Sequence, residues 1–353
     1  MMERVDSEMM SAAIAAARGH RPHPNPRVGA VVVDGDGRII GRGGHSGPGR
    51  SHAEVLALAE AGPSAQGAAL YVTLEPCAHH GETPPCTEAI IAAGITRVVV
   101  ALEDPDRRVA GRGLDALRRS GIEVVTGIGA AEALTLDPGY FHHRITGRPR
   151  VTLKVAMTLD GQIAAEDGTS QWITSVEARQ DAHRLRSCHD AVMVGAGTLL
   201  ADDPALTVRL DGHEGPQPLA VIVAGRRPVP PSLRIFERPA LVFSPIGLEL
   251  PAEVVVLPDP SGERVDLIKM LEILASRGVV DLLVEGGSSL AAAFWRAGLV
   301  DHGVFYAAAA LAGGTGRGIF DAIFRTVSDL QRVSFTAIEQ VGPDIRIDFE
   351  GVK

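Results

Sequence analysis

Apolar and polar positions alternate along the chain in short blocks that predict strands and helices in turn. In the first part, apolar runs at 28–33, 69–73, 97–101 and 122–126 have the length of buried strands, and a turn at 34–37 begins a hairpin that returns at 39–40. Helices are expected at 7–19, 52–61, 87–93 and 114–119, and glycine follows or ends most of them. This alternation indicates a layered α/β domain.

A second series of the same kind begins after Gly147. Strands are expected at 151–157, 191–194, 219–223, 240–243, 254–256, 281–284 and 303–307, helices at 175–186, 265–277 and 289–297, and a closing antiparallel pair at 332–338 and 345–349. A chain of 353 residues suits two domains. We therefore expect one domain over residues 1–146 and a second over 147–353.

Composition and charge narrow the classes of function. The net charge of −9 and the 4% of aromatic residues argue against a surface for nucleic acid. No apolar run reaches the roughly 18–20 residues of a membrane span, and the N-terminus lacks the layout of a signal peptide. Three cysteines make a disulfide framework implausible, so the cytoplasm is the expected compartment.

Two of these cysteines, Cys77 and Cys86, follow a His52-Ala53-Glu54 segment at the predicted start of a helix. One imidazole and two thiolates supply three ligands for Zn²⁺ and leave a fourth position for water, as a catalytic zinc requires. Glu54 is placed to move protons rather than to bind the metal, as in zinc deaminases. His79 or His80 is an alternative fourth ligand, although contact with substrate or solvent is favoured. His45 is expected to be a polar surface residue, and Cys188 a small buried apolar residue.

The spacing of the cysteines separates this pattern from that of cytidine deaminases and nucleic-acid editors, which usually have two residues between them. Here there are eight, in the run TLEPCAHHGETPPC at 73–86. This run, PNPRVG at 24–29 and VAGRG at 109–113 resemble the family of bifunctional riboflavin-biosynthesis deaminase/reductases. Within that resemblance, Asn25 is expected to bind substrate. The chain departs from the family's pattern at Glu82, where a basic residue is common, and at Asp106-Arg107, where Asn-Pro is common.

The second half has no G-x-G-x-x-G after a strand, so it is not an ordinary dinucleotide-binding domain. Lys154 lies in a buried-type strand, where a charge is costly unless it is paired or faces a site. Glu285-Gly286-Gly287 follows a strand and opens a helix, and its glycines permit close approach of a phosphate. The order LKVAMTLDG, SQWIT, VGAGTLLADDPALTVR and EGG resembles the reductase domain of the same family, a relative of dihydrofolate reductase.

The resemblance implies a cytidine-deaminase-like three-layer α/β/α domain, followed by a dihydrofolate-reductase-like α/β domain. It implies a hydrolase and oxidoreductase that takes Zn²⁺ and NADPH. The first domain would deaminate 2,5-diamino-6-ribosylamino-4(3H)-pyrimidinone 5′-phosphate, and the second would reduce the ribosyl group of 5-amino-6-(5-phosphoribosylamino)uracil to ribityl. Cofactor contacts are expected at Ala156, Trp172, Thr198, Asp202, Gly287, Ser288, Ser289, Leu290, Ala291, Ala292 and Ala293. Substrate contacts are expected at Lys154, Ser170, Arg186, Leu206, Arg209 and Glu285.

Arginines 186 and 209 suit a ribose 5-phosphate because a guanidinium binds phosphate through two bonds. Lys154 and Asp202 are candidates for handling protons in the reduction. Thr158, Ala309 and Ala312 depart from the family's pattern, and the last two predict a loop of different shape. We expect small phosphorylated pyrimidines as partners, with no nucleic acid or membrane, and a homo-oligomer, either a dimer or a tetramer.

Two other functions stay open from the sequence alone. One is a zinc deaminase that acts on RNA or another nucleobase, with the second half as a binding module. The aromatic content, the charge and the eight-residue spacer speak against it. The other is a paralogue in which one domain is inactive. The presence of Glu54 is evidence against it, and the departures from the family's pattern at Glu82, Asp106 and Ala309 are evidence for it.

Overall fold

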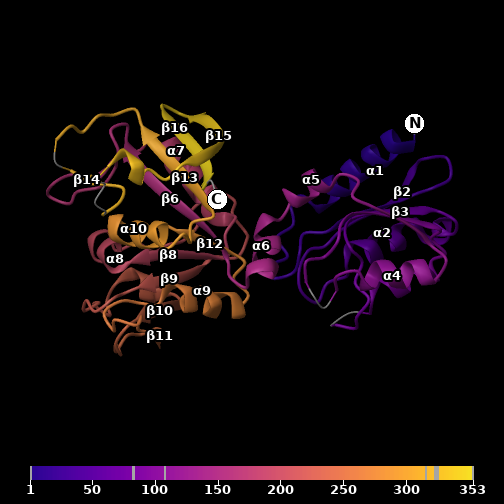
Figure 1. Cartoon of the computed structure of the whole chain (residues 1–353), viewed down its shortest axis with the longest axis horizontal. Coiled ribbons are helices and arrows are strands. Elements are labelled where there is room, and N and C mark those ends of the chain that lie inside the picture. The colour runs from indigo at the N-terminus through magenta and orange to yellow at the C-terminus, as the bar shows by residue number, and fades with distance from the viewer. Residues whose placement is uncertain (1, 82–83, 107–108, 315, 322–325, 352–353) are drawn as a thin grey trace. The chain divides into compact units, whose positions relative to one another are not determined.

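A computed structural model describes residues 2–81, 84–106, 109–314, 316–321 and 326–351. The chain divides into two compact units, Met1–Gly147 and Arg148–Lys353, which are described separately (Figure 1). Glu82 and Arg107, two of the departures from the family's pattern, lie outside the described residues. Among the residues described, no helix combines the length and the apolar character needed to cross a bilayer.

The first unit is built on a five-stranded sheet in the order β2-β1-β3-β4-β5. Strand β1 pairs antiparallel with β2 and β3, whereas β3, β4 and β5 are parallel. The strands are β1 (Gly29–Val33), β2 (Ile39–Gly44), β3 (Ala69–Leu74), β4 (Arg97–Leu102) and β5 (Glu123–Thr126). The helices are α1 (Met2–Ala17), α2 (Ala53–Ala61), α3 (Cys86–Ala92), α4 (Arg112–Arg119), α5 (Ala130–Leu134) and α6 (Pro138–Thr146).

Helices cover both faces of this sheet. Met10 and Ile14 of α1 and Ala133 of α5 share one apolar core with Val31 of β1 and Val99 of β4. Helix α2 packs on the opposite face, and α4 lies on the same side of the sheet (Figure 1). Helix α3 contacts both of them. The three-layer α/β/α arrangement expected for the first domain is therefore confirmed, although helices α5 and α6 were not predicted.

Glycines in β2 allow α2 to lie directly against the sheet. A Cβ atom on Gly41 would stand 2.1 Å from the carbonyl oxygen of Ala57, and one on Gly43 would stand 2.0 Å from that of Ala53. Any other residue at either position would push the helix away. This close approach fixes the start of α2, where His52 and Glu54 lie.

The second unit contains a nine-stranded sheet in the order β11-β10-β9-β8-β12-β6-β13-β16-β15. The first seven strands in this order are parallel, and the last two pairings are antiparallel. The strands are β6 (Arg150–Thr158), β8 (Ala191–Gly195), β9 (Leu219–Val223), β10 (Ala240–Ser244), β11 (Glu253–Val256), β12 (Asp281–Val284), β13 (His302–Ala308), β15 (Val333–Val341) and β16 (Asp344–Gly351). The expected closing pair is thus confirmed.

Two cores lie on the two faces of this sheet. Helices α9 (Leu267–Ser276) and α10 (Ser288–Arg296) bury Leu274 and Phe294 against one face. Helix α8 (Ala196–Asp202) buries Leu199 on the other, where Leu185 of α7 (Val176–Ser187) also packs. Short strands β7 (Gln162–Ala164) and β14 (Arg317–Gly318) form a separate ribbon. The sequence pattern did not predict α8, β7 or β14.

Candidate active sites

In the first unit, His52, Cys77 and Cys86 converge from three elements. His52 is the N-cap of α2, Cys77 follows β3, and Cys86 is the first residue of α3. Nδ1 of His52 lies 3.1 Å from Sγ of Cys86 and 3.6 Å from Sγ of Cys77. Zinc bonds of about 2.0–2.3 Å at tetrahedral angles separate such ligand atoms by about 3.5–3.8 Å. The three side chains therefore fit a zinc ion with only small adjustment.

The two thiols are electrostatically different. A hydrogen bond with Cys86 and contact with His52 lower the pKa of Cys77 to about 4, despite burial that acts in the opposite direction. The backbone N–H of Cys86, at the start of α3, also donates to Sγ of Cys77 at 3.4 Å. The pKa of Cys86 is raised by its bond to Cys77 and by burial. A thiolate, the form that binds metal, is thus favoured at Cys77.

Glu54 lies in the first turn of α2, beside these ligands, and its residue exposure is 3%. Burial raises the pKa of its carboxyl group to about 7, against the opposing influence of His52. A carboxyl group that titrates near neutral pH can both accept and release a proton, which suits general acid–base catalysis.

The expectation that His45 is a surface residue was wrong. His45 is 3% exposed, and the carbonyl oxygen of Ser51 accepts a hydrogen bond from its Nδ1 at 3.2 Å. Because a carbonyl can only accept, Nδ1 carries the proton and Nε2 accepts from the amide nitrogen of Asn25 at 3.1 Å. The ring also packs edge-on against that of His52. His45 therefore orients Asn25, a role that the sequence did not signal.

His79 and His80 do not join the metal-ligand cluster. Both are exposed, and Nε2 of His80 lies 3.8 Å from the Glu88 carboxylate at the surface. The cluster among the described residues comprises His52, Cys77 and Cys86, with no fourth protein ligand. This composition leaves a position for water.

Glu75, two residues before Cys77, binds the loop that leads into α4. Its two carboxylate oxygens accept hydrogen bonds from the backbone N–H groups of Asp104, Gly111, Gly113 and Leu114 at 2.8–3.3 Å. A Cβ atom on Gly113 would stand 1.9 Å from the carbonyl oxygen of Pro76, so only glycine fits there. The VAGRG motif at 109–113 thus supplies backbone N–H donors to this carboxylate, and these hydrogen bonds fix the chain beside Cys77.

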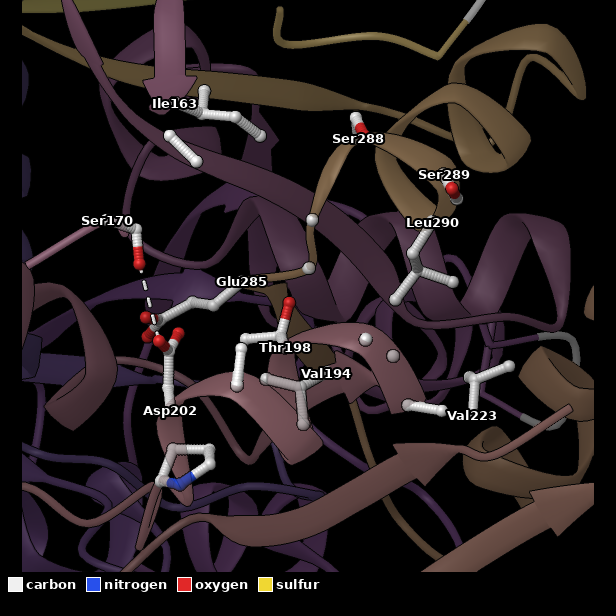
Figure 2. Close-up of a pocket in the computed structure, with 18 of the residues that line it drawn as sticks. Ile163, Ser170, Val194, Thr198, Asp202, Val223, Glu285, Ser288, Ser289 and Leu290 are labelled. Carbon is white, nitrogen blue, oxygen red and sulfur yellow. Dashed lines mark hydrogen bonds between the residues drawn. The ribbon is translucent and has the colours of Figure 1, made fainter. Parts of the chain in front are cut away.

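In the second unit, a cavity of about 1410 Å³ opens at the carboxyl ends of the parallel strands. Fifteen of the expected reductase contacts line it: Lys154, Ala156, Ser170, Trp172, Arg186, Thr198, Asp202, Leu206, Arg209, Glu285, Gly287, Ser288, Ser289, Leu290 and Ala293. Ala291 and Ala292 do not line it, because they point from α10 into the core and are 1% exposed. Figure 2 shows Ser170 and Asp202 joined by a hydrogen bond of 3.3 Å, with Glu285 beside them.

Glu285 is the centre of a charge cluster at one end of this cavity. Nε and Nη2 of Arg186 donate to its two oxygens at 2.5 and 2.9 Å, and Nζ of Lys154 lies 3.7 Å away. Burial alone would raise the pKa of Glu285, but these two cations lower it to about 2. The strand lysine is therefore paired, as its burial requires. Because Arg186 also donates to the Thr207 carbonyl, few of its donors are left for a phosphate.

Arg209 is more accessible than Arg186. It is exposed on the cavity wall, and within the described ranges its guanidinium makes one long hydrogen bond, of 3.4 Å, to the hydroxyl of Thr207. Nearby, burial and the charge of Arg186 lower the pKa of His183 to about 4, which keeps that ring neutral. Arg209 is thus the better placed of the two expected phosphate partners.

The loop after β13 is held despite its unusual residues. Oxygen atoms of Asp160 accept from the backbone N–H groups of Ala312 and Gly313 at 3.1 and 2.8 Å. The hydroxyl of Thr158 donates to Asp160 at 2.5 Å and so serves as a serine would. These bonds, with that of Thr158 first, lower the pKa of Asp160 to about 2.

Cys188 is exposed, contrary to expectation, because it is the C-cap of α7 and the neighbouring His189 takes the buried position. Seven further arginines of the reductase cavity were not predicted from the sequence, at 226, 227, 179, 234, 264, 296 and 317. The signal that could have found the first two is their place directly after the strand β9, at the edge where ligands bind in parallel sheets.

Comparison with known families assigns both halves. Residues 3–102 match the cytidine and deoxycytidylate deaminase zinc-binding region, and residues 149–347 match the RibD C-terminal domain. The chain is 42% identical to the riboflavin biosynthesis protein RibD of Bacillus amyloliquefaciens, over 96% of this chain and 94% of that protein. It is 40% identical to RibD of Escherichia coli (strain K12), over 98% of this chain and 99% of that protein.

Solved structures agree over the full length. RibD of Acinetobacter baumannii superposes with a TM-score of 0.93 at 38% identity and covers 100% of both chains. A diaminohydroxyphosphoribosylaminopyrimidine deaminase/5-amino-6-(5-phosphoribosylamino)uracil reductase from Thermotoga maritima superposes with a TM-score of 0.90 at 35% identity, again over 100% of both chains.

Proposed function

This chain belongs to the RibD family of bifunctional riboflavin-biosynthesis enzymes, and from that membership we propose which of its residues carry each reaction. It combines a zinc-dependent deaminase, a hydrolase, with an NADPH-dependent reductase, and it acts on small pyrimidines. The family model over residues 149–347 contradicts the alternative in which the second half is only a binding module.

The substrates and the division of labour are proposals. The deaminase, residues 1–146, acts on 2,5-diamino-6-ribosylamino-4(3H)-pyrimidinone 5′-phosphate, and the reductase, residues 147–353, acts on 5-amino-6-(5-phosphoribosylamino)uracil. The names of the two activities of the Thermotoga maritima relative support this proposal.

In the deaminase, His52, Cys77 and Cys86 hold the zinc, and Asn25, oriented by His45, binds the pyrimidine. Bound zinc supplies the Lewis acidity that makes water nucleophilic near neutral pH. Glu54 would accept a proton from the attacking water and donate it to the ring nitrogen. It would then take up the proton of the newly added hydroxyl group and deliver it to the departing amine, which leaves as ammonia. The single observation that carries this role is the buried carboxyl group of Glu54 with its pKa near 7, next to three converging ligands.

In the reductase, NADPH supplies the hydride for the C1′ carbon of the opened ribosylamino group. Ala156, Trp172, Thr198, Asp202, Gly287, Ser288, Ser289, Leu290 and Ala293 contact the cofactor, and all of them line the cavity. Arg209 binds the phosphate of the substrate, and Ser170, Leu206 and the cluster of Glu285, Arg186 and Lys154 surround its sugar. Lys154 handles the proton, since burial lowers its pKa, and Asp202 is the second candidate.

We also propose that the protein forms a homo-oligomer and acts in the cytoplasm. The edge strand β15 presents Phe335 and Ile338 at 64% and 62% exposure, as a strand at a subunit interface would. Phe335→Glu would then lower the molar mass measured by light scattering. All three cysteines are free thiols, which suits a reducing compartment.

An assay on the diaminopyrimidine substrate that follows ammonia release and NADPH oxidation separately tests both halves. Glu54→Gln should retain zinc and lose about 10²–10⁴-fold in ammonia release. It should still oxidise NADPH when given the deaminated intermediate. Full deamination by this variant would refute the role of Glu54, and a wild-type chain that performs one reaction only would revive the paralogue with one inactive domain.

A further inference from the structure

The reductase cavity is basic although the chain as a whole is acidic. Nine arginines and one lysine line it, against six carboxylates, whereas the whole chain has a net charge of −9. A local excess of cations concentrates anionic ligands in the cavity in spite of the overall charge. The question is which of these cations is free to bind a ligand, and where it lies.

The two ends of the cavity differ in their side chains. Ser170, Asp202 and Glu285 lie at one end, and Val223 and Leu290 lie at the other, with Thr198 and Ser288 between them (Figure 2). The first end carries the charged cluster proposed to surround the sugar of the substrate, so it takes the nicotinamide. The adenosine half of a dinucleotide then extends toward Val223, the last residue of β9.

The turn after β9 places two arginines at this second end. Gly225, with φ of +61°, turns the chain so that Arg226 and Arg227 are exposed on the cavity wall. Arg226 is already engaged, since its Nη1 donates to the Gly262 carbonyl at 3.0 Å and lies 3.3 Å from Glu263.

Arg227 is not engaged in this way. Within the described part of the chain, its guanidinium makes no hydrogen bond or ion pair, and its Nη1 is 4.0 Å from the position that a Cβ atom of Gly197 would occupy. Since Gly197 lies in the first turn of α8 and both residues line the cavity, the guanidinium lies on the cavity wall beside the start of this helix.

We propose that Arg227 binds the 2′-phosphate of NADPH and thereby sets the preference of the reductase for NADPH over NADH. The two cofactors differ only in this dianionic group on the adenosine ribose. A free guanidinium can bind it through two charge-assisted hydrogen bonds, whereas NADH would leave the arginine without a partner. The inference rests on the proposed placement of the cofactor in this cavity.

The test compares adenosine 2′,5′-bisphosphate with 5′-AMP, which lacks only the 2′-phosphate, by titration calorimetry without substrate. The wild-type protein should bind the bisphosphate more tightly. Arg227→Gln should weaken that binding about 10–100-fold and change 5′-AMP binding less than about twofold. Arg332→Gln removes the same charge from an exposed position outside the cavity, and it should bind both ligands as the wild type does.

Each outcome separates the inference from its premise. A wild-type protein that binds neither nucleotide would refute the placement of the cofactor. Discrimination that survives Arg227→Gln, or equal weakening of both ligands, would overturn the role of Arg227 while the cofactor site stands. Arg227→Lys keeps the charge but not the two-pronged geometry, so it should bind the bisphosphate with an affinity between those of the wild type and Arg227→Gln. The same order should hold for NADP⁺ against NAD⁺.

Discussion

Glu75 offers a sharp test of how the zinc site is held. Its carboxylate accepts four backbone hydrogen bonds, from residues 104, 111, 113 and 114, and the residue is 4% exposed. In Glu75→Gln, one oxygen remains an acceptor, but the new amide NH₂ faces two N–H donors. Two charge-assisted hydrogen bonds are then lost, and this loss should lower the free energy of unfolding by about 3–6 kcal/mol. Because Cys77 is two residues away, zinc should also dissociate faster.

Urea denaturation of the zinc-loaded protein measures this effect, with zinc release followed by a chromogenic chelator. The transition that releases zinc belongs to the first unit, and only that transition should move to lower urea. Glu60→Gln is the matched control, since the exposed carboxylate of Glu60 accepts a single backbone bond, from Arg42 at 2.9 Å. This control substitution should lower the free energy of unfolding by about 0.5 kcal/mol or less. If Glu75→Gln behaves like this control, the carboxylate does not hold the loop as the hydrogen bonds imply.

Three further predictions address the ligands, the phosphate and the pH dependence. Cys77→Ser should lower the zinc content measured by metal analysis, and Cys188→Ser, at an exposed position, should leave it unchanged. Arg209→Ala should raise the KM of the reductase substrate about 10–100-fold at a similar kcat, and an unchanged KM would remove this arginine from the site. Burial alone would raise the pKa of Asp348, but hydrogen bonds from a histidine and an arginine lower it from 3.8 to about 2. A carboxyl group whose pKa is lowered by folding stabilises the fold at pH values above its ordinary pKa. This stabilisation is lost as the pH falls through the pKa of the folded state. The stability gap between the wild type and Asp348→Asn should therefore shrink between about pH 5 and pH 2 in denaturant titrations.

Most of the regular elements could be predicted because the apolar periodicity is strong where a strand or helix is buried. The strands that form the centre of both sheets, such as β4 and β12, are continuous apolar runs. Helix α8 was missed because Gly197 in its first turn disfavours a helix locally, and the burial of Leu199 outweighs that preference. Strand β14 was missed because a strand of two residues is too short to show an alternation of apolar and polar positions.

By itself the sequence determined the metal-binding chemistry, since one histidine, two cysteines and a glutamate at this spacing specify ligand types and a proton carrier. It also determined the order of the two activities along the chain. It did not determine which polar groups are buried or paired. Only the tertiary structure showed that His45 orients Asn25 and that Glu75 binds the loop before α4. It also showed that Arg186 is engaged by Glu285, whereas Arg227 has no hydrogen bond or ion pair with the residues that the structure describes. These relations join residues that are 20 to 99 positions apart, or depend on burial, and no local pattern encodes such distances.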